Sequence, residues 1–395
     1  MDVLRDEPDA DLAWLAAQLG RFLFFMGKPD RAAERLEQAL TMAESLGLPE
    51  VLSQALNTKA LILLSARGRP EEGLALLRHS LVVALDNDVS SAAQRAYYNL
   101  SNLLYYRDQH DEALRYGQEG LALARRVGER GWEWSFLANM VAVYYWTGRW
   151  DEAVDTAADI PPLEEIPATR FASVELLLSL APLLVARGQI REARTVLGPF
   201  EAFGVSADEQ ERASYWAADA IVLRAEGKTA QGLEEAERLI AERASFNAGF
   251  GGMKLALVEA IEAAISLGRR ERAEQLVGQI QRLPAGELTP YLRAQAARFG
   301  AVLDAWAGVP EAPEAGFKEA GGLFREIEVP FWLAVTLLEH AEWLVGQGRA
   351  VEADGLLREA EEIFERLKAR PWLERLATVR VGVQQLSPVV AERGS

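Results

Sequence analysis

The stretch from Asp108 to Gly148, DQHDEALRYGQEGLALARRVGERGWEWSFLANMVAVYYWTG, is one copy of a unit that recurs along the chain. Each copy opens with a Gly or Asp, in most copies followed by a polar residue, and has a small residue five positions later. These opening positions, here called anchors, are Gly27, Gly68, Asp108, Gly148, Gly188, Gly227, Gly268, Gly308 and Gly348. They lie 39 to 41 residues apart over nearly all of the 395 residues. A period this constant predicts similar units stacked in a row, each burying its apolar face on its neighbours.

The sequence between anchors has helical periodicity. Before Asp108, an apolar stripe at positions i, i+3, i+4 and i+7 begins at Tyr97, and after it a stripe of small residues begins at Ala113. Each repeat is therefore predicted to be a helical hairpin, with helix A before the anchor and helix B after it. Glycine suits the anchor because it tolerates the left-handed conformation with which many helices end.

A small residue recurs five positions after each anchor. These positions hold Ala32, Gly73, Ala113, Ala153, Ala193, Gly232, Ala273, Pro313 and Ala353. Eight of the nine are Ala or Gly. Because only small side chains allow two helices to cross closely, this pattern predicts tight packing of helix A on helix B in each hairpin.

Composition excludes several classes of function. The formal net charge of -17 and the pI near 4.9 argue against a surface that binds nucleic acid or anionic lipid directly. The chain has no cysteine, so disulfides and thiolate metal sites are excluded. Its first residues, MDVLRDEPDADLAW, are unlike a secretion signal, and no apolar run approaches the roughly 18 residues that a membrane span requires. We expect a cytoplasmic protein without a membrane partner.

No arrangement of residues predicts catalysis. The three histidines, His79, His110 and His340, lie in different repeats, and His110 is expected to be a solvated turn residue. The segment GFGGMK, residues 249–254, lacks the spacing of a phosphate loop and is interpreted as a hinge. The sequence therefore predicts no catalytic residue, no metal ligand and no cofactor, and we expect the protein not to be an enzyme.

The repeats resemble tetratricopeptide repeats. Leu19-Gly20 and Leu100-Ser101 match the Leu-Gly-type pair of that family's helix A, and the small residues after the anchors match its helix B. The longer period is similar to the 40-residue variety found C-terminal in MalT-like LuxR-type ATPase regulators and in bacterial nucleotide cyclases. The ending AEEIFERLKARPWLERL, residues 360–376, is similar to the close of those arrays, with Lys368 where Gly is expected. The resemblance covers about residues 10 to 385.

The predicted fold is an all-α, right-handed superhelical solenoid of about nine such hairpins. A capping helix over residues 371–386 is expected to close it, with Trp372 buried. Prolines between Ile160 and Pro167 should shorten helix B of the fourth repeat and kink the array. The chain is thus divided into repeats 1 to 4, residues 1–160, and repeats 5 to 9 with the cap, residues 161–395, as one continuous solenoid.

Three positions of each helix A are predicted to face the groove of the array, opposite the packing stripe. They lie ten, six and three residues before the anchor. In the third and fourth repeats they hold Tyr98, Asn102, Tyr105, Ala138, Ala142 and Tyr145. Large and small residues side by side would leave a pocket, and twelve of the 33 aromatic residues lie between Tyr97 and Trp150. Aromatic residues with a polar group are typical of ligand sites.

The resemblance adds a role for asparagine. In tetratricopeptide repeats an Asn about nine residues before the anchor binds the backbone of a peptide, and here Asn99 and Asn139 occupy that place. The predicted ligand- or peptide-binding residues are Arg95, Tyr98, Asn99, Asn102, Tyr105, Asn139, Tyr145 and Trp146. Core packing is the alternative for this set, and it is the preferred interpretation for Tyr97, Phe136 and Tyr144.

Charge along the predicted groove is uneven. Lys59 and Arg95 are its basic residues. The later repeats place four glutamates in the groove: Glu259, Glu262, Glu339 and Glu342. These negative charges disfavour an acidic partner tail. The predicted function is a non-enzymatic interaction or sensory module of a signalling or transcription-regulatory protein, which binds a peptide, a partner helix or a small effector. A free-standing scaffold without a small-molecule ligand is the alternative, and a hidden hydrolase would require titratable groups to converge. The ligand and the oligomeric state stay open.

Overall fold

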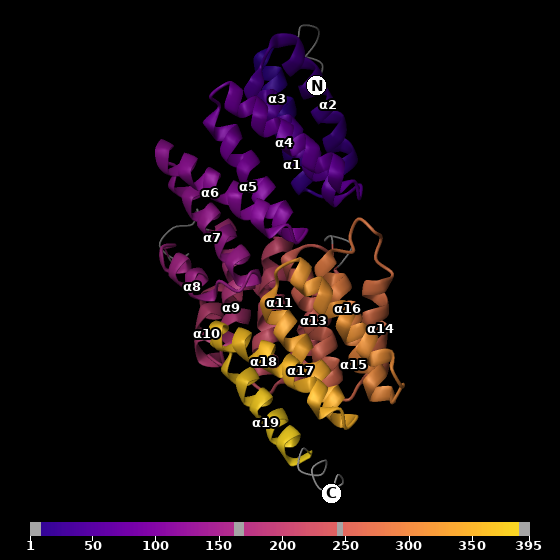
Figure 1. Cartoon of the computed structure of the whole chain (residues 1–395). Helices are drawn as coiled ribbons and strands as arrows, with labels where there is room; N and C mark the ends of the chain where they lie inside the picture. Colours follow the sequence, from indigo (N-terminus) through magenta and orange to yellow (C-terminus); the bar gives the residue numbers. More distant parts are fainter. Residues whose placement is uncertain (1–8, 162–169, 243–247, 387–395) are drawn as a thin grey trace, which may run out of the picture. The chain divides into compact units, whose positions relative to one another are not determined.

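The computed structural model describes residues 9–161, 170–242 and 248–386. All regular elements in these ranges are helices, and their order is drawn in Figure 1. The chain divides into two bodies, which are described separately. The N-terminal body comprises residues 1–105 and 111–136, and the C-terminal body comprises residues 106–110 and 137–395. The prediction of an all-α array of helical hairpins is confirmed.

The N-terminal body contains the first three hairpins. Its helices are α1 (Ala10–Phe25), α2 (Pro29–Leu46), α3 (Pro49–Ser65), α4 (Pro70–Asp86), most of α5 (Ser90–Tyr106) and α6 (His110–Val127), and the start of α7 (Arg130–Trp146). From α1 to α4 each helix packs on the next, and α1 also contacts α3. The ring of Phe136 fills the space over Gly120, where an added Cβ would lie 2.3 Å from it.

The C-terminal body contains the remaining hairpins. Its helices are the end of α7, α8 (Trp150–Ala158), α9 (Arg170–Ala186), α10 (Ile190–Leu197), the 3-10 helix η2 (Gly198–Val205), α11 (Glu209–Ala225), α12 (Thr229–Ala241), α13 (Gly251–Ser266), α14 (Arg270–Gln281), α15 (Pro290–Ala307), α16 (Ala312–Glu326), α17 (Pro330–Gly346), α18 (Ala350–Leu367) and α19 (Arg370–Leu386). Helices α9, α11, α13, α15, α17 and α19 contact one another in this order. They form the inner row of the body.

The anchors end helix A as predicted. All nine have a positive φ, between 60° and 82°. Eight are glycines, for which this left-handed conformation costs little, and the ninth is Asp108, with a φ of 64°. Lys368 also has a left-handed conformation, with a φ of 60°, and ends α18 where the resemblance led us to expect Gly.

The small positions after the anchors lie where the helices of each hairpin cross. All nine are buried. A Cβ added at Gly232 would lie 2.7 Å from the carbonyl oxygen of Ala220, and one added at Gly73 would lie 2.9 Å from that of Ala60. Backbone therefore approaches backbone at these crossings, and the predicted close packing is confirmed.

Four local predictions have different outcomes. Helix α8 ends at Ala158, so helix B of the fourth repeat is short as expected, while residues 162–169, where we placed the kink, lie outside the described residues. The prediction of a hinge at residues 249–254 was wrong for residues 251–254, because these residues form the first turn of α13. Trp372 is half-buried rather than buried, because it covers Phe331 and Phe364 from the outside. His110 is buried, not solvated, because its Nδ1 lies 3.1 Å from the carbonyl oxygen of Ile327.

Residues far apart in sequence meet inside the C-terminal body. The carboxylate of Asp108 accepts a hydrogen bond from the backbone N–H of Tyr291 at 2.7 Å. The rings of Trp150 and Phe331 lie 5.3 Å apart, and Lys368 pairs with Asp151 at 2.8 Å. The hairpins of this body therefore wind until the turns of the early repeats contact the helices of the last ones. No helix in the described ranges is long and apolar enough to cross a membrane.

Candidate functional site

The inner row of the C-terminal body and α16 line an open cavity of about 390 Å³. Residues ten, six and three positions before Gly268, Gly308 and Gly348 make up nine predicted groove positions. Six of them line the cavity: Glu262, Ile265, Arg298, Val302, Ala305 and Glu342. The spacing rule therefore identifies a shared face in the last three repeats, and this face carries charged side chains.

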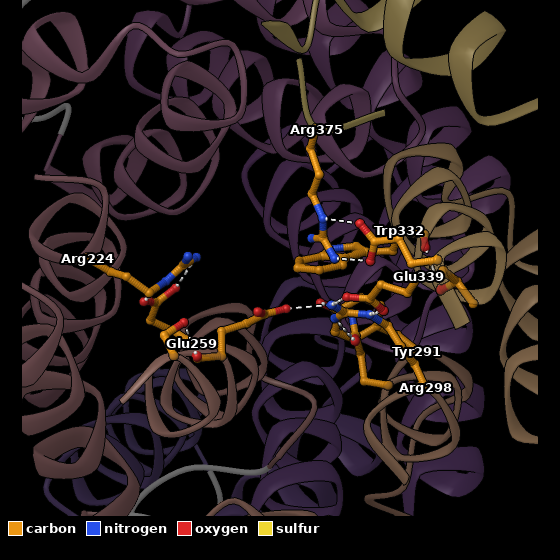
Figure 2. Close-up of polar contacts among 12 residues, drawn as sticks. Arg224, Glu259, Tyr291, Arg298, Trp332, Glu339 and Arg375 are labelled. Atoms are coloured by element: carbon orange, nitrogen blue, oxygen red, sulfur yellow. Dashed lines mark hydrogen bonds and ion pairs between the residues drawn. The ribbon is translucent and has the colours of Figure 1, made fainter. Parts of the chain in front are cut away.

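Arg298, on α15, is the centre of the charged group (Figure 2). Only 1% of its side chain is exposed. Its Nε and Nη2 donate to both carboxylate oxygens of Glu339 on α17, at 2.7 and 2.5 Å, and Nη2 also donates to Glu262 on α13 at 2.6 Å. Nη1 donates to Gln295 at 3.1 Å. Burial alone would lower the pKa of Arg298, but the carboxylates of Glu339 and Glu262 outweigh it and raise the pKa.

Two further ion pairs extend this group along the inner row (Figure 2). Arg224 on α11 binds both carboxylate oxygens of Glu259 on α13, the longer contact being 3.0 Å. Arg375 on α19 binds both oxygens of Glu342 on α17, at 2.7 and 2.6 Å. Burial raises the pKa of Glu259, and Arg224 opposes this rise. Such two-point pairing fixes side-chain geometry as well as charge.

The later groove is less acidic than expected. Three arginines, Arg224, Arg298 and Arg375, form ion pairs with its four glutamates. Two of these arginines had a signal in the sequence, because Arg224 lies three residues before Gly227 and Arg298 lies ten residues before Gly308. Arg375 follows the last anchor, so the spacing rule did not reach it.

Arg95, in the N-terminal body, is a buried cation. Its side chain lies on α5, is 8% exposed, and donates through Nη2 to the hydroxyl of Thr58 on α3 at 2.9 Å. No carboxylate of the described residues pairs with it. Burial, and then the charge of Arg21, lowers the pKa of Arg95. An arginine in this state is pre-positioned for an anionic group because its charge is not yet neutralised.

The neighbouring predicted residues of α5 are polar or aromatic. Asn99 donates to the side-chain oxygen of Asn57 on α3 at 2.6 Å, while Nδ2 of Asn57 is buried without a hydrogen bond in the described structure. Asn102 is half-buried. Tyr98 is also half-buried, with its ring 5.6 Å from that of Trp132. Tyr105, by contrast, is only 2% exposed and belongs to the packed interior.

The other three predicted residues lie in the C-terminal body. Tyr145 and Trp146 are buried among aromatic rings, with Tyr145 in contact with Trp150 and Trp146 4.7 Å from the ring of Tyr291. Burial raises the pKa of Tyr145. Asn139 is completely buried, and neither polar atom of its amide has a hydrogen-bond partner in the part of the chain that is described. Their part in binding stays a prediction, as does that of the five residues of α5.

The described ranges contain no candidate metal site. No group of three or more His, Asp or Glu side chains there has a geometry that could hold an ion. His340 stacks on Phe317 at 5.4 Å, and burial lowers the pKa of its imidazole.

The fold defines the class of protein. A family model described as a tetratricopeptide repeat matches residues 94–127, which span most of α5 and α6. Since the same hairpin recurs at every anchor, the chain is a tetratricopeptide-repeat array. The MalT-like variety of this repeat stays a prediction.

Two solved structures are similar over most of their length. The apo form of the quorum sensor NprR from B. thuringiensis has 13% sequence identity and a TM-score of 0.41, with 92% of this chain and 90% of that chain covered. The tetratricopeptide-repeat domain of P58(IPK) has 16% identity and a TM-score of 0.26, with 96% of this chain and 99% of that chain covered. No match was found among curated proteins.

Proposed function

We propose that the protein is a non-enzymatic tetratricopeptide-repeat module that binds a peptide segment of a partner on the face formed by α3 and α5. The observation that carries this proposal is the state of Arg95. It is nine-tenths buried and has a hydroxyl, but no carboxylate, as its partner among the described residues. Burying an uncompensated charge costs several kcal/mol, so a carboxylate supplied by a ligand would be strongly favoured there.

The rest of the face suits an extended peptide. Arg95, Asn99 and Asn102 are four and three residues apart on α5, so they point to the same side of the helix. Asparagine amides can both donate to and accept from a peptide backbone. Tyr98 is half-buried beside them and offers a ring for an apolar side chain. Arg95 would take a carboxylate of the peptide.

This proposal refines the partner expected from the sequence. One buried arginine favours a single carboxylate, such as a chain terminus or one acidic side chain, rather than a strongly acidic tail. By resemblance, we further propose that the module serves a signalling or transcription-regulatory protein. A scaffold without a small-molecule ligand would use the same face.

The test is fluorescence anisotropy with a library of labelled decapeptides, each prepared with a free and with an amidated C-terminus. For the peptides that bind, Arg95→Gln should weaken affinity by about tenfold or more, because a charge-assisted hydrogen bond is lost. Arg126→Gln, at an exposed arginine of α6 in the same body, should leave affinity unchanged. Equal affinity of wild type and Arg95→Gln would refute the proposed site.

A further inference from the structure

The walls of the cavity hold one carboxylate more than guanidinium groups: Glu262, Glu339 and Glu342 against Arg298 and Arg375. Glu339 and Glu342 each form a two-point pair with one of these arginines. Glu262 shares Arg298 with Glu339 and receives a single contact from it, at 2.6 Å to its Oε1. The other oxygen, Oε2, accepts no hydrogen bond from any described residue. Three carboxylates of the cavity therefore face two guanidinium groups, and Glu262 is the one whose charge is only partly compensated, by a single hydrogen bond.

The position of Glu262 makes this charge accessible. Its side chain lines the cavity and is 19% exposed. The cavity volume of about 390 Å³ lies within the range of small-ligand pockets. Despite burial, the charges of Arg298 and Arg224 lower the pKa of Glu262, so its carboxylate is ionised at neutral pH.

The other walls of the cavity are aromatic and aliphatic. Phe299 on α15, Phe317 on α16 and Trp343 on α17 line it, with Ile265 and Val302 beside them. Aromatic faces attract cations, and apolar walls favour a hydrocarbon stem. Arg298 and Arg375 also line the cavity, but each already binds a carboxylate on two points, so an anion would find no free cation there.

We propose that this cavity binds a guanidinium or ammonium group carried on an apolar stem, with Oε2 of Glu262 accepting its hydrogen bond. The aromatic walls contact the stem. This site is separate from the peptide face of the N-terminal body. Its ligand is either the side chain of an arginine or lysine in a peptide or a free amine of the same chemistry.

The experiment is calorimetric titration of the full chain with n-butylguanidinium and with n-butylurea, a neutral molecule of nearly the same shape. We expect n-butylguanidinium to bind at least about tenfold more tightly, since charged hydrogen bonds exceed neutral ones by this order. Glu262→Gln should reduce that affinity to the level of n-butylurea. Glu319→Gln, at an exposed carboxylate of α16, should not change it.

A second variant tests the location independently of the charge. Ala305 lines the cavity and is half-buried, so Ala305→Trp should fill the space and abolish binding while the helical circular dichroism is retained. A capped alanine peptide with one central arginine distinguishes the two sources of ligand: tighter binding than n-butylguanidinium assigns a peptide side chain, and weaker binding assigns a free amine. Equal affinity for the two small probes, unchanged affinity in Glu262→Gln, or no saturable binding of n-butylguanidinium would overturn the proposal.

Discussion

Asp108 and Lys254, which are 146 residues apart in the sequence, form an ion pair that is almost completely buried in the C-terminal body. Asp108 occupies an anchor where eight other repeats have glycine, and its carboxylate also accepts the backbone N–H of Tyr291. The ammonium group of Lys254 lies 5.7 Å from the ring centre of Trp146. The departure from glycine at this anchor is therefore explained by a tertiary contact: the third repeat's turn is joined to α13 and α15.

Removing one partner of this pair should be costly. Lys254→Met leaves the carboxylate of Asp108 buried without its cation, and we expect a loss of about 3–5 kcal/mol in urea unfolding. The double variant Asp108→Gly with Lys254→Met restores the anchor glycine and removes the unpaired charge, so it should be more stable than Lys254→Met alone. Lys318→Met, which removes an exposed pair with Glu314, should cost no more than about 1 kcal/mol. Similar losses for Lys254→Met and Lys318→Met would contradict the buried-pair account.

The close crossings of the hairpins predict opposite effects of one substitution at two glycines. Gly232→Ala would place a methyl group 2.7 Å from the backbone oxygen of Ala220 and should destabilise the protein by about 1–3 kcal/mol. Gly322 lies on the exposed side of α16, and a Cβ added there would have no atom within 4 Å. Gly322→Ala should therefore stabilise the protein by about 0.5–1 kcal/mol. Thermal unfolding of the two variants checks both signs. A neutral effect at Gly232 would mean that the helices can separate there at little cost.

The two tyrosines predicted for the groove should differ in stability. Tyr105 is 2% exposed, so Tyr105→Ala leaves a cavity and should cost about 3–5 kcal/mol. Tyr98 is half-buried, and Tyr98→Ala should cost clearly less while weakening peptide binding. Melting temperature and anisotropy, measured on both variants, separate the two roles. If Tyr98→Ala loses as much stability as Tyr105→Ala, Tyr98 belongs to the packed core and not to the peptide face.

Glu314 predicts a specific acid sensitivity. Its hydrogen bonds to Arg349 and Lys318 lower its pKa from 4.5 to about 2. The pKa is lower in the folded state, so the pair stabilises the fold at pH values above 4.5, and this contribution is lost as the pH falls toward 2. The free energy of unfolding of the wild type should therefore exceed that of Glu314→Gln by about 1 kcal/mol or less at pH 7. At pH 2 the two free energies should be almost equal. A difference that does not shrink with pH would exclude the ion pair as its cause.

The sequence predicted the helical hairpins well because their determinants are local and repeat. The anchors and the small crossing positions follow from the 40-residue period, and each occurs where expected. The end of α18 at Lys368 was expected from the resemblance of the C-terminal segment instead. The face that lines the cavity was also predictable from spacing. Its charge balance was not, because Arg375 lies beyond the last anchor and pairs with Glu342, 33 residues earlier.

The 40-residue period of the sequence did not predict the contacts between distant repeats of the C-terminal body. His110 was expected to be solvated, yet it reaches the carbonyl oxygen of Ile327, 217 residues later. Lys254, in a segment interpreted as a hinge, is the buried partner of Asp108. Such pairs depend on how the hairpins of this body stack over many repeats, which brings distant repeats into contact. A repeat pattern specifies each hairpin and its neighbour but not this closure.

Photo-crosslinking of the tightest-binding library peptide, carrying a diazirine group, tests the peptide-binding account most directly. The account predicts that mass spectrometry will find the label on α3 near Asn57 and Thr58 and on α5 between Arg95 and Tyr105, and that Arg95→Gln will abolish it. Labelling confined to α2, α4 and α6, with no dependence on Arg95, would contradict it.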